Sequence, residues 1–189
     1  MWRLSTAERR IALTFDDGPH PEYTPAVLDL LARLDVRATF FVVGRNVDRH
    51  PLQVERMVRE GHAVGGHSYD HTVITSQTAE ALADDLTRCA DAIRRAGHVD
   101  SNLFRPPKGD VDLASMRRVC RLGYRLVHWT RTYSDFQQDG TMPLLARMNE
   151  QPPSAGDIVL LHDHNSHTVA ALADQIPRWR AAGFGFCTL

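Results

Sequence analysis

The chain has 189 residues, of which 43% are hydrophobic and 24% are charged, and its formal net charge at pH 7 is -1. This composition predicts one globular domain spanning residues 1–189, and the balanced charge argues against a nucleic-acid partner or a polybasic membrane anchor. No run of 18 apolar residues indicates a transmembrane segment, and residues 1–10 lack the apolar run of a signal peptide. As written, the chain is expected to be cytoplasmic, or periplasmic or secreted if a leader has been removed.

The first half of the sequence alternates between strand and helix patterns. Ile11, Leu13 and Phe15 alternate with less apolar neighbours, and Gly18 with Pro19 ends this strand. Apolar residues at helical spacing follow, and glycines mark where the later helices end. The pattern predicts strands over 10–15, 38–43 and 63–64 and helices over 23–34, 51–60 and 79–96, the last one stopped by Gly97.

The second half continues the alternation less regularly. The pattern predicts strands over 103–104, 125–129, 157–161 and 184–188, helices over 113–122 and 168–182, and a polar loop over 130–141. About seven strand–helix units in one chain imply a parallel sheet, either doubly wound or closed as a barrel.

In both architectures, functional sites form at the C-terminal ends of the strands. Titratable side chains follow five of the expected strands, in the segments 16–17, 67–71, 105–109, 132–136 and 162–164. The adjacent carboxylates of Asp16 and Asp17 repel each other unless a cation or a metal neutralises one of them. His67 and His71 are four residues apart, so we expect one turn of helix to place both imidazoles on the same side.

Two histidines and one carboxylate leave open positions on a divalent metal, as a catalytic site requires. By themselves, the acidic pair also fits an Asp-Gly turn, and the histidine pair fits two surface or capping residues. A zinc peptidase helix would carry Glu where Ser68 stands. A non-haem iron oxygenase uses a similar triad, but we expect that triad on an all-β barrel.

Five segments, in their order and spacing, resemble the motifs of the polysaccharide deacetylases, which form carbohydrate esterase family 4 and share the nodulation-protein-B homology domain. The segments are Thr14 to Pro19, His67 to His71, Arg105 to Pro107, Asp135 with Phe136, and Leu160 to His162. The resemblance extends from Ile11 to Leu189. It implies a distorted (β/α) barrel with about seven parallel strands.

The resemblance also implies a divalent metal held by Asp17, His67 and His71, usually zinc, with cobalt, manganese or nickel as alternatives. Asp16 resembles the general base that acts on water, and Arg105 the group that orients this base. His162 resembles the general acid, and Asp135 the carboxylate that tunes it. The family further suggests that Leu160 and Phe136 wall an acetyl pocket and that a backbone N–H near Lys108 stabilises the oxyanion.

Four positions depart from the family pattern. Gly66 stands where Asn is common, Lys108 replaces an aromatic residue, Thr132 replaces an Asp and Phe136 replaces a Trp. None of the four is a ligand, the base or the acid, so they bear on substrate choice more than on catalysis.

The expected function is therefore the removal of N-acetyl groups from an N-acetylated glycan, such as a chitooligosaccharide, peptidoglycan or an exopolysaccharide, with release of acetate. The alternatives are a deacylase of another N-acyl or O-acetyl substrate, such as acetylxylan or a lipid-linked sugar, and a non-catalytic glycan-binding relic of the fold.

Overall fold

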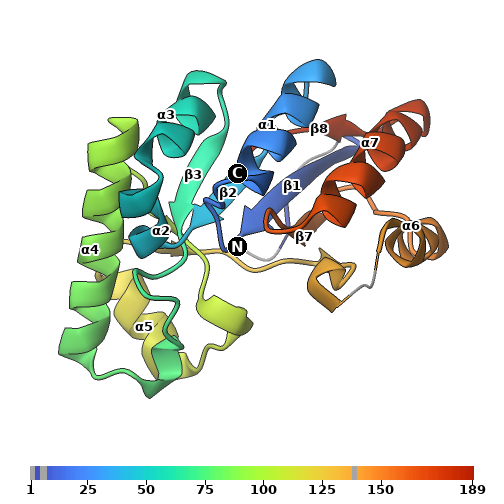
Figure 1. Cartoon of the computed structure of the whole chain (residues 1–189). Coiled ribbons are helices and arrows are strands. Elements are labelled where there is room, and N and C mark those ends of the chain that lie inside the picture. The colour runs from blue at the N-terminus through green and yellow to red at the C-terminus, as the bar shows by residue number, and fades with distance from the viewer. Residues whose placement is uncertain (1–2, 5–7, 138–139) are drawn as a thin grey trace.

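The computed structural model describes residues 3–4, 8–137 and 140–189. Its centre is a sheet of parallel strands (Figure 1). Most of the strands are short runs of apolar residues, and turn-forming residues flank each run. The strands are β1 Arg10–Asp16, β2 Thr39–Val42, β3 Ala63–Gly66, β4 Leu103–Phe104, β5 Arg125–Leu126, β6 Arg131–Thr132, β7 Ile158–His162 and β8 Gly185–Phe186.

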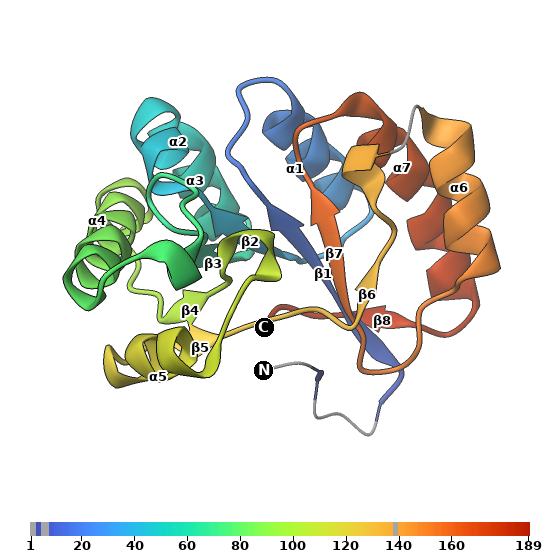
Figure 2. The same ribbon diagram turned by 90° about the horizontal axis from the view of Figure 1, so that it is seen from below.

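The first strand lies inside this sheet, between β2 and β7. The order is β5-β4-β3-β2-β1-β7-β6, and β8 pairs with the start of β1. Phe15 of β1 stands opposite Phe40 of β2 on one side and Leu161 of β7 on the other, in parallel register. In the part of the chain that the structure describes, no pairing joins β5 to β6, so the sheet is curled but open (Figure 2). The expected distorted barrel of about seven parallel strands is confirmed, with β8 as a short addition.

Helices cover the outer face of the curled sheet. Figure 2 shows α2, α3 and α4 toward one end and α1, α7 and α6 toward the other. The helices are α1 Tyr23–Arg33, α2 Gly44–Arg49, α3 Pro51–Arg59, α4 Ala79–Gly97, α5 Leu113–Arg121, α6 Thr141–Glu150 and α7 Ser166–Ala181. Polar side chains cap three of them, because Thr78, Asp112 and Asn165 accept backbone N–H groups of α4, α5 and α7. Among the described residues, no helix is both long and apolar enough to span a membrane.

Side-chain alternation along β1 separates two environments. Ile11, Leu13 and Phe15 are almost completely buried in the main hydrophobic cluster, which α1 and α7 help to cover. The alternate residues Thr14 and Asp16 are equally buried, but both accept hydrogen bonds from Arg105 on the inner side of the barrel. On one face of β1, therefore, the side chains pack in the hydrophobic core, and on the other face they are polar and point toward the inner side of the barrel.

Several elements differ from the expectations. The helices α2 and α6 were not anticipated; α2 is only six residues long, and α6 buries Leu144 and Met148 but leaves Met142 exposed. Part of the expected loop over 130–141 forms β6 and a 3-10 turn, Asp135–Gln137, while residues 138–139 of that loop lie outside the described residues. The strand expected over 125–129 is limited to β5. Helix α4 ends at Gly97, close to the expected end, and the residue after it, His98, is left-handed.

Candidate active site

A cleft of about 460 Å³ opens at the C-terminal ends of the strands. It is lined by Asp16, Asp17, His67, His71, Lys108, Gly109, Trp129, Phe136, Leu160, His162 and His164. Eight of these residues were expected from the sequence to belong to the site. The two other expected site residues, Arg105 and Asp135, are completely buried behind the lining. All ten expected site residues are therefore brought together.

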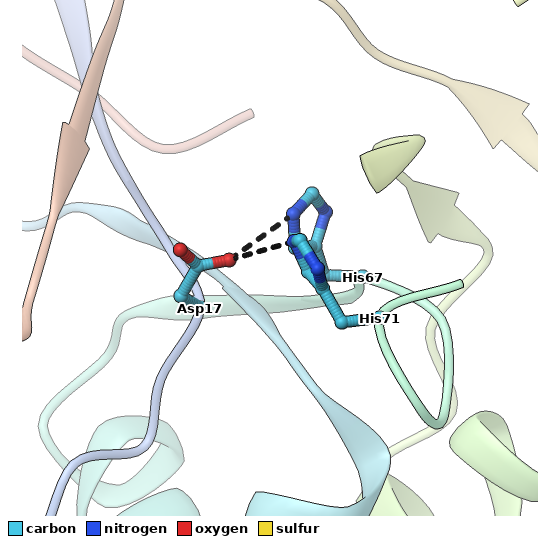
Figure 3. A group of neighbouring side chains, drawn as sticks. All are labelled: Asp17, His67 and His71. Carbon is cyan, nitrogen blue, oxygen red and sulfur yellow. Dashed lines mark ion pairs between the residues drawn. The ribbon is translucent and has the colours of Figure 1, made fainter. Parts of the chain in front are cut away.

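Asp17, His67 and His71 form one corner of the cleft. Figure 3 shows both imidazoles pointing at the same carboxylate oxygen of Asp17, with Oδ1 3.5 Å from Nε2 of His67 and 3.1 Å from Nε2 of His71. Each residue offers one ligand atom, and the three atoms lie within 4.8 Å of one another. This is the donor set and spacing that a divalent cation can bridge.

The hydrogen bonds around these residues fit a metal. The Nδ1 atom of His67 lies 2.8 Å from the backbone carbonyl oxygen of Arg105, and because a carbonyl only accepts, this nitrogen carries the proton. The Nε2 lone pair of a neutral His67 then faces Asp17, an arrangement that is favourable with a cation between them. The Oδ1 atom of Asp17 is buried and receives no well-formed hydrogen bond from the described residues. Burial alone would raise the pKa of Asp17, but its contacts with His67 and His71 lower the pKa well below the ordinary value.

The segment that carries the two histidines is not helical, so the expectation of a helical turn over 67–71 is wrong. Ser68 and His71 have φ of 65° and 60°, which no helix contains. Tertiary hydrogen bonds shape this loop instead: the backbone N–H of Gly44 donates to Ser68 O at 3.0 Å, and that of Tyr69 donates to Oδ1 of Asp85 at 2.6 Å. A Cβ on Gly44 would lie 2.4 Å from the Tyr69 ring, so only glycine permits this close approach.

Asp16 ends β1 and is 3% exposed. Its Oδ1 accepts a hydrogen bond of 2.7 Å from Nη1 of Arg105, and its Oδ2 lies 3.9 Å from Nε2 of His67. Arg105 is itself held by hydrogen bonds to Oγ1 of Thr14 and the carbonyl of His128, and its guanidinium lies over the ring of Phe41. Arg105 therefore holds one oxygen of Asp16 and leaves the other facing the corner formed by Asp17 and the two histidines.

His162 ends β7 on the opposite side of Asp17. Its Nδ1–H donates to Oδ1 of Asp135 at 2.8 Å, while its Nε2 lies 4.0 Å from Oδ2 of Asp17. Asp135 also accepts from the backbone N–H of His162 and from the hydroxyl of Thr168. Burial by itself lowers the pKa of His162, but Asp135, aided by the charges of Asp16 and Asp17, outweighs it and raises the pKa above its ordinary value.

Some residues of the site were not anticipated. Trp129 lines the cleft, although it was expected only as the end of a strand, and Thr168 supports Asp135 from the first turn of α7. His164 belongs to the segment 162–164 that was expected at a strand end, and it lines the cleft with its ring 5.2 Å from that of His162. Trp129 could have been assigned to the site from the sequence, because it lies at the C-terminal end of an expected strand. Nothing in the sequence around Thr168 indicates its contact with Asp135.

Asp163 lies directly behind the site and is completely buried. Asn165 caps α7, whereas Asp163 accepts a hydrogen bond from the hydroxyl of Thr24. Its carboxylate lies so close to Gly18 that a Cβ there would clash with both oxygens. Burial raises the pKa of Asp163 to about 7.

The chain is similar to several known proteins. The sequence profile of the family described as polysaccharide deacetylase matches residues 3–127. The chain is 36% identical to a peptidoglycan-N-acetylglucosamine deacetylase of Bacillus cereus over 100% of the chain and 90% of that protein. It is 35% identical to the peptidoglycan-N-acetylmuramic acid deacetylase PdaA of Bacillus subtilis, over 96% of the chain and 70% of the relative. It also matches the longer peptidoglycan-N-acetylglucosamine deacetylase PgdA of Listeria monocytogenes, with 34% identity over 96% of the chain but only 38% of that protein.

Solved structures share the fold. The chain superposes on the Bc1960 peptidoglycan N-acetylglucosamine deacetylase with a TM-score of 0.93 and 27% identity, over 100% of the chain and 89% of that structure. It also superposes on BA3943 from Bacillus anthracis, described as a pseudoenzyme of carbohydrate esterase family 4, with a TM-score of 0.92 and 26% identity, over 100% of the chain and 66% of that structure. A shared fold thus does not decide catalysis, and the side chains of the site must do so.

Proposed function

Because the chain belongs to the polysaccharide deacetylase family, we propose that it is a metal-dependent hydrolase that removes N-acetyl groups from N-acetylated glycans and releases acetate. Relatives act on N-acetylglucosamine and on N-acetylmuramic acid of peptidoglycan, so a glycan built from such sugars is the proposed substrate. The observation that carries the proposal is the convergence of a buried carboxylate, a buried imidazole and a candidate metal corner on one cleft.

Asp17, His67 and His71 would hold the divalent ion, proposed to be zinc with cobalt, manganese or nickel as alternatives. When bound, the ion supplies Lewis acidity toward the acetyl carbonyl and makes water more acidic. Asp16 accepts a proton from the water as the water oxygen bonds to the acetyl carbon, and Arg105 holds Asp16 in position for this step. The free Oδ2 of Asp16 is the oxygen that faces the metal corner.

His162 acts on the leaving group. As the bond between the carbonyl carbon and the nitrogen breaks, Nε2–H of His162 donates a proton to the departing amine, which leaves acetate and a free amino sugar. Asp135 keeps the other ring nitrogen protonated and raises the pKa of His162, so the imidazolium is available near neutral pH. The backbone N–H of Lys108 donates to no acceptor among the described residues and is free to bind the oxyanion.

Apolar side chains complete the pocket. Leu160 is 5% exposed at the floor of the cleft, and Phe136 packs edge-on against His162 with ring centroids 5.1 Å apart. Together with Trp129, these side chains provide an apolar surface for an acetyl methyl group and a sugar face.

The alternatives make different predictions. An O-acetyl or longer N-acyl substrate would use the same residues, whereas a non-catalytic relic would have no use for a base. The full set of Asp16, Arg105, Asp135 and His162, in hydrogen-bonded pairs, favours catalysis over glycan binding alone.

The test is acetate release from three substrates: N-acetylglucosamine oligomers, peptidoglycan and acetylxylan. Each is incubated with protein treated with chelator and then with protein to which zinc has been added back. We expect release from the first two substrates only when metal is present. If acetate were released from acetylxylan alone, the assignment would change from an N-acetyl to an O-acetyl substrate. If no acetate were released from any substrate with any metal, the non-catalytic alternative would be supported.

A further inference from the structure

Lys108 is the only lysine in a sequence with 22 lysines and arginines. It is one of the residues that line the candidate active site. All the other basic residues counted here are arginines. Lys108 therefore differs from them in having a compact, strongly hydrated ammonium, which lies beside the cleft.

The turn that presents Lys108 is tightly built. Lys108 and Gly109 follow the buried Arg105 and both have positive φ, 59° and 66°. The backbone N–H of Gly109 closes the turn by donating to Pro106 O at 3.0 Å. A Cβ on Gly109 would lie 2.4 Å from Cη2 of Trp129, so the absence of that atom lets the turn lie directly on the indole. The base of Lys108 is therefore fixed next to an aromatic face of the cleft.

Lys108 differs from the other charged groups of the cleft because it has no partner among the residues that the structure describes. Asp16 is paired with Arg105, Asp17 faces two histidines, and His162 is paired with the buried Asp135. The exposed ammonium of Lys108 makes no ion pair and no hydrogen bond with the described residues. An unpaired cation at the rim of an otherwise paired site complements an anion on the molecule that enters.

Resting on the function proposed above, we infer that Lys108 selects N-acetylated sugars that carry a carboxylate on or next to the ring bearing the acetamide. A single ammonium matches one unit of negative charge, whereas a phosphate is usually held by several donors. The apolar face of Trp129 beside it is suited to the sugar ring itself. Neutral glycans still reach the catalytic groups but lack this contact.

A charge contact of this kind at an exposed position changes affinity by about two- to fivefold at low ionic strength. Because the ammonium would contact the substrate carboxylate and not the reacting atoms, its removal should raise KM for the acidic substrate relative to the neutral one. The preference should also shrink as salt screens the contact.

The test measures KM and kcat for each of two substrates with each of four proteins. The substrates are one oligosaccharide of alternating N-acetylglucosamine and N-acetylmuramic acid, and the same oligosaccharide with its carboxylates converted to carboxamides. The proteins are the wild type, Lys108→Gln, Lys108→Arg and the control Arg121→Gln, which removes an exposed cation on α5 away from the cleft. We expect the wild type, Lys108→Arg and Arg121→Gln to prefer the carboxylate through KM, and Lys108→Gln to treat both forms alike. Equal KM values for both forms in the wild type, or an intact preference in Lys108→Gln, would overturn the inference.

A binding measurement separates this inference from the proposed reaction. Calorimetric titration of the zinc-loaded Asp16→Asn protein with both oligosaccharides reports recognition without turnover. If the wild type releases acetate from neither oligosaccharide, the proposed function fails for these substrates, and the two dissociation constants still judge the role of Lys108. The inference about Lys108 is supported if the Asp16→Asn protein binds the carboxylate form more tightly than the carboxamide form and if the double variant Asp16→Asn/Lys108→Gln loses this difference. Equal dissociation constants for the two forms in Asp16→Asn refute the inference.

Discussion

Asp16 and Asp17 are neighbours in the sequence but have different surroundings. Asp16 is the last residue of β1, so its side chain lies on the inner face and meets Arg105. Asp17 has φ of 75°, which turns its carboxylate toward His67 and His71. One backbone dihedral thus separates a candidate base from a candidate metal ligand, although the two carboxylates differ by a single position.

Replacement of the base tests this division. Asp16→Asn keeps the size of the side chain and an acceptor for Arg105, but a neutral amide cannot take a proton from water. We expect the variant to bind zinc with the stoichiometry of the wild type and to lose turnover by ~10²–10⁴-fold. Metal content by elemental analysis and steady-state acetate release check the two statements. Near-normal turnover at full metal occupancy would remove Asp16 from the base role.

The pH dependence should report His162. The acid is useful only as an imidazolium, so its contribution to the rate is present below the pKa of His162 and is lost as pH rises through that value. Since Asp135 raises the pKa, the basic limb of kcat/KM should lie above about 6.5, the ordinary value for histidine. Asp135→Asn removes the negative charge, so we expect this limb to move to lower pH. His162→Ala should abolish the limb and slow the reaction by ~10²–10⁴-fold. A basic limb unchanged in both variants would exclude His162 as the acid.

At the scale of elements, the loop between β3 and the 3-10 turn Ile74–Ser76 depends on α4. Asp85 of α4 is 6% exposed and accepts hydrogen bonds from the backbone N–H of Tyr69 and the amide of Gln77. Tyr69 lies between His67 and His71, so a carboxylate on a helix fixes the backbone that positions both imidazoles. The phenol of Tyr69 adds a second connection, since it donates to Asp48 at 2.7 Å.

Removal of this acceptor should loosen the metal site. In Asp85→Ala, the N–H of Tyr69 loses its partner, and we expect zinc affinity to fall by roughly 10–100-fold, as for other groups that support metal ligands. Asp85→Asn retains an acceptor oxygen for the N–H of Tyr69, so its zinc affinity should fall less than that of Asp85→Ala. Zinc affinity is measured by competition with a chelator. The control Asp112→Ala removes the cap of α5 and lowers stability slightly without touching the loop. Equal zinc affinities in Asp85→Ala and Asp112→Ala would contradict the role given to Asp85.

At the scale of the whole molecule, the candidate metal site joins distant parts of an open barrel. Asp17 follows β1 and His67 follows β3, with β2 between the two strands in the sheet. A ligand that binds only the folded arrangement adds its binding free energy to the free energy of unfolding.

Zinc should therefore raise the melting temperature. At about 100 times its dissociation constant, zinc adds ~2.7 kcal/mol, which corresponds to roughly 5–10 °C for a chain of this size. Thermal unfolding followed by circular dichroism, with excess zinc and with chelator, measures the difference. In His71→Ala, which replaces a partly exposed ligand, we expect the zinc-dependent rise to shrink or disappear. A rise of the same size in that variant would place the stabilising metal elsewhere.

The sequence by itself determined the strand–helix alternation and most of the residues that gather at the cleft. Strand and helix periods and turn residues are local signals, so they predicted the strand β1, the long helix α4 and the gathering of five polar segments at one edge of the sheet. The resemblance to the polysaccharide deacetylases added Leu160 and the expected role of each residue. Local signals could not predict α2, since six residues carry too little periodicity, or β6, whose Arg131 and Thr132 become a strand only by pairing with β7.

The tertiary structure alone decided how the side chains of the site face one another. The spacing of His67 and His71 suggested a helical turn, but hydrogen bonds from Gly44 to Ser68 and from Tyr69 to Asp85 impose left-handed residues instead. These bonds join groups that are distant in the sequence, so no local pattern encodes them. The burial of Arg105 against Phe41, which aims one oxygen of Asp16 at the metal corner, likewise exists only once the sheet has curled.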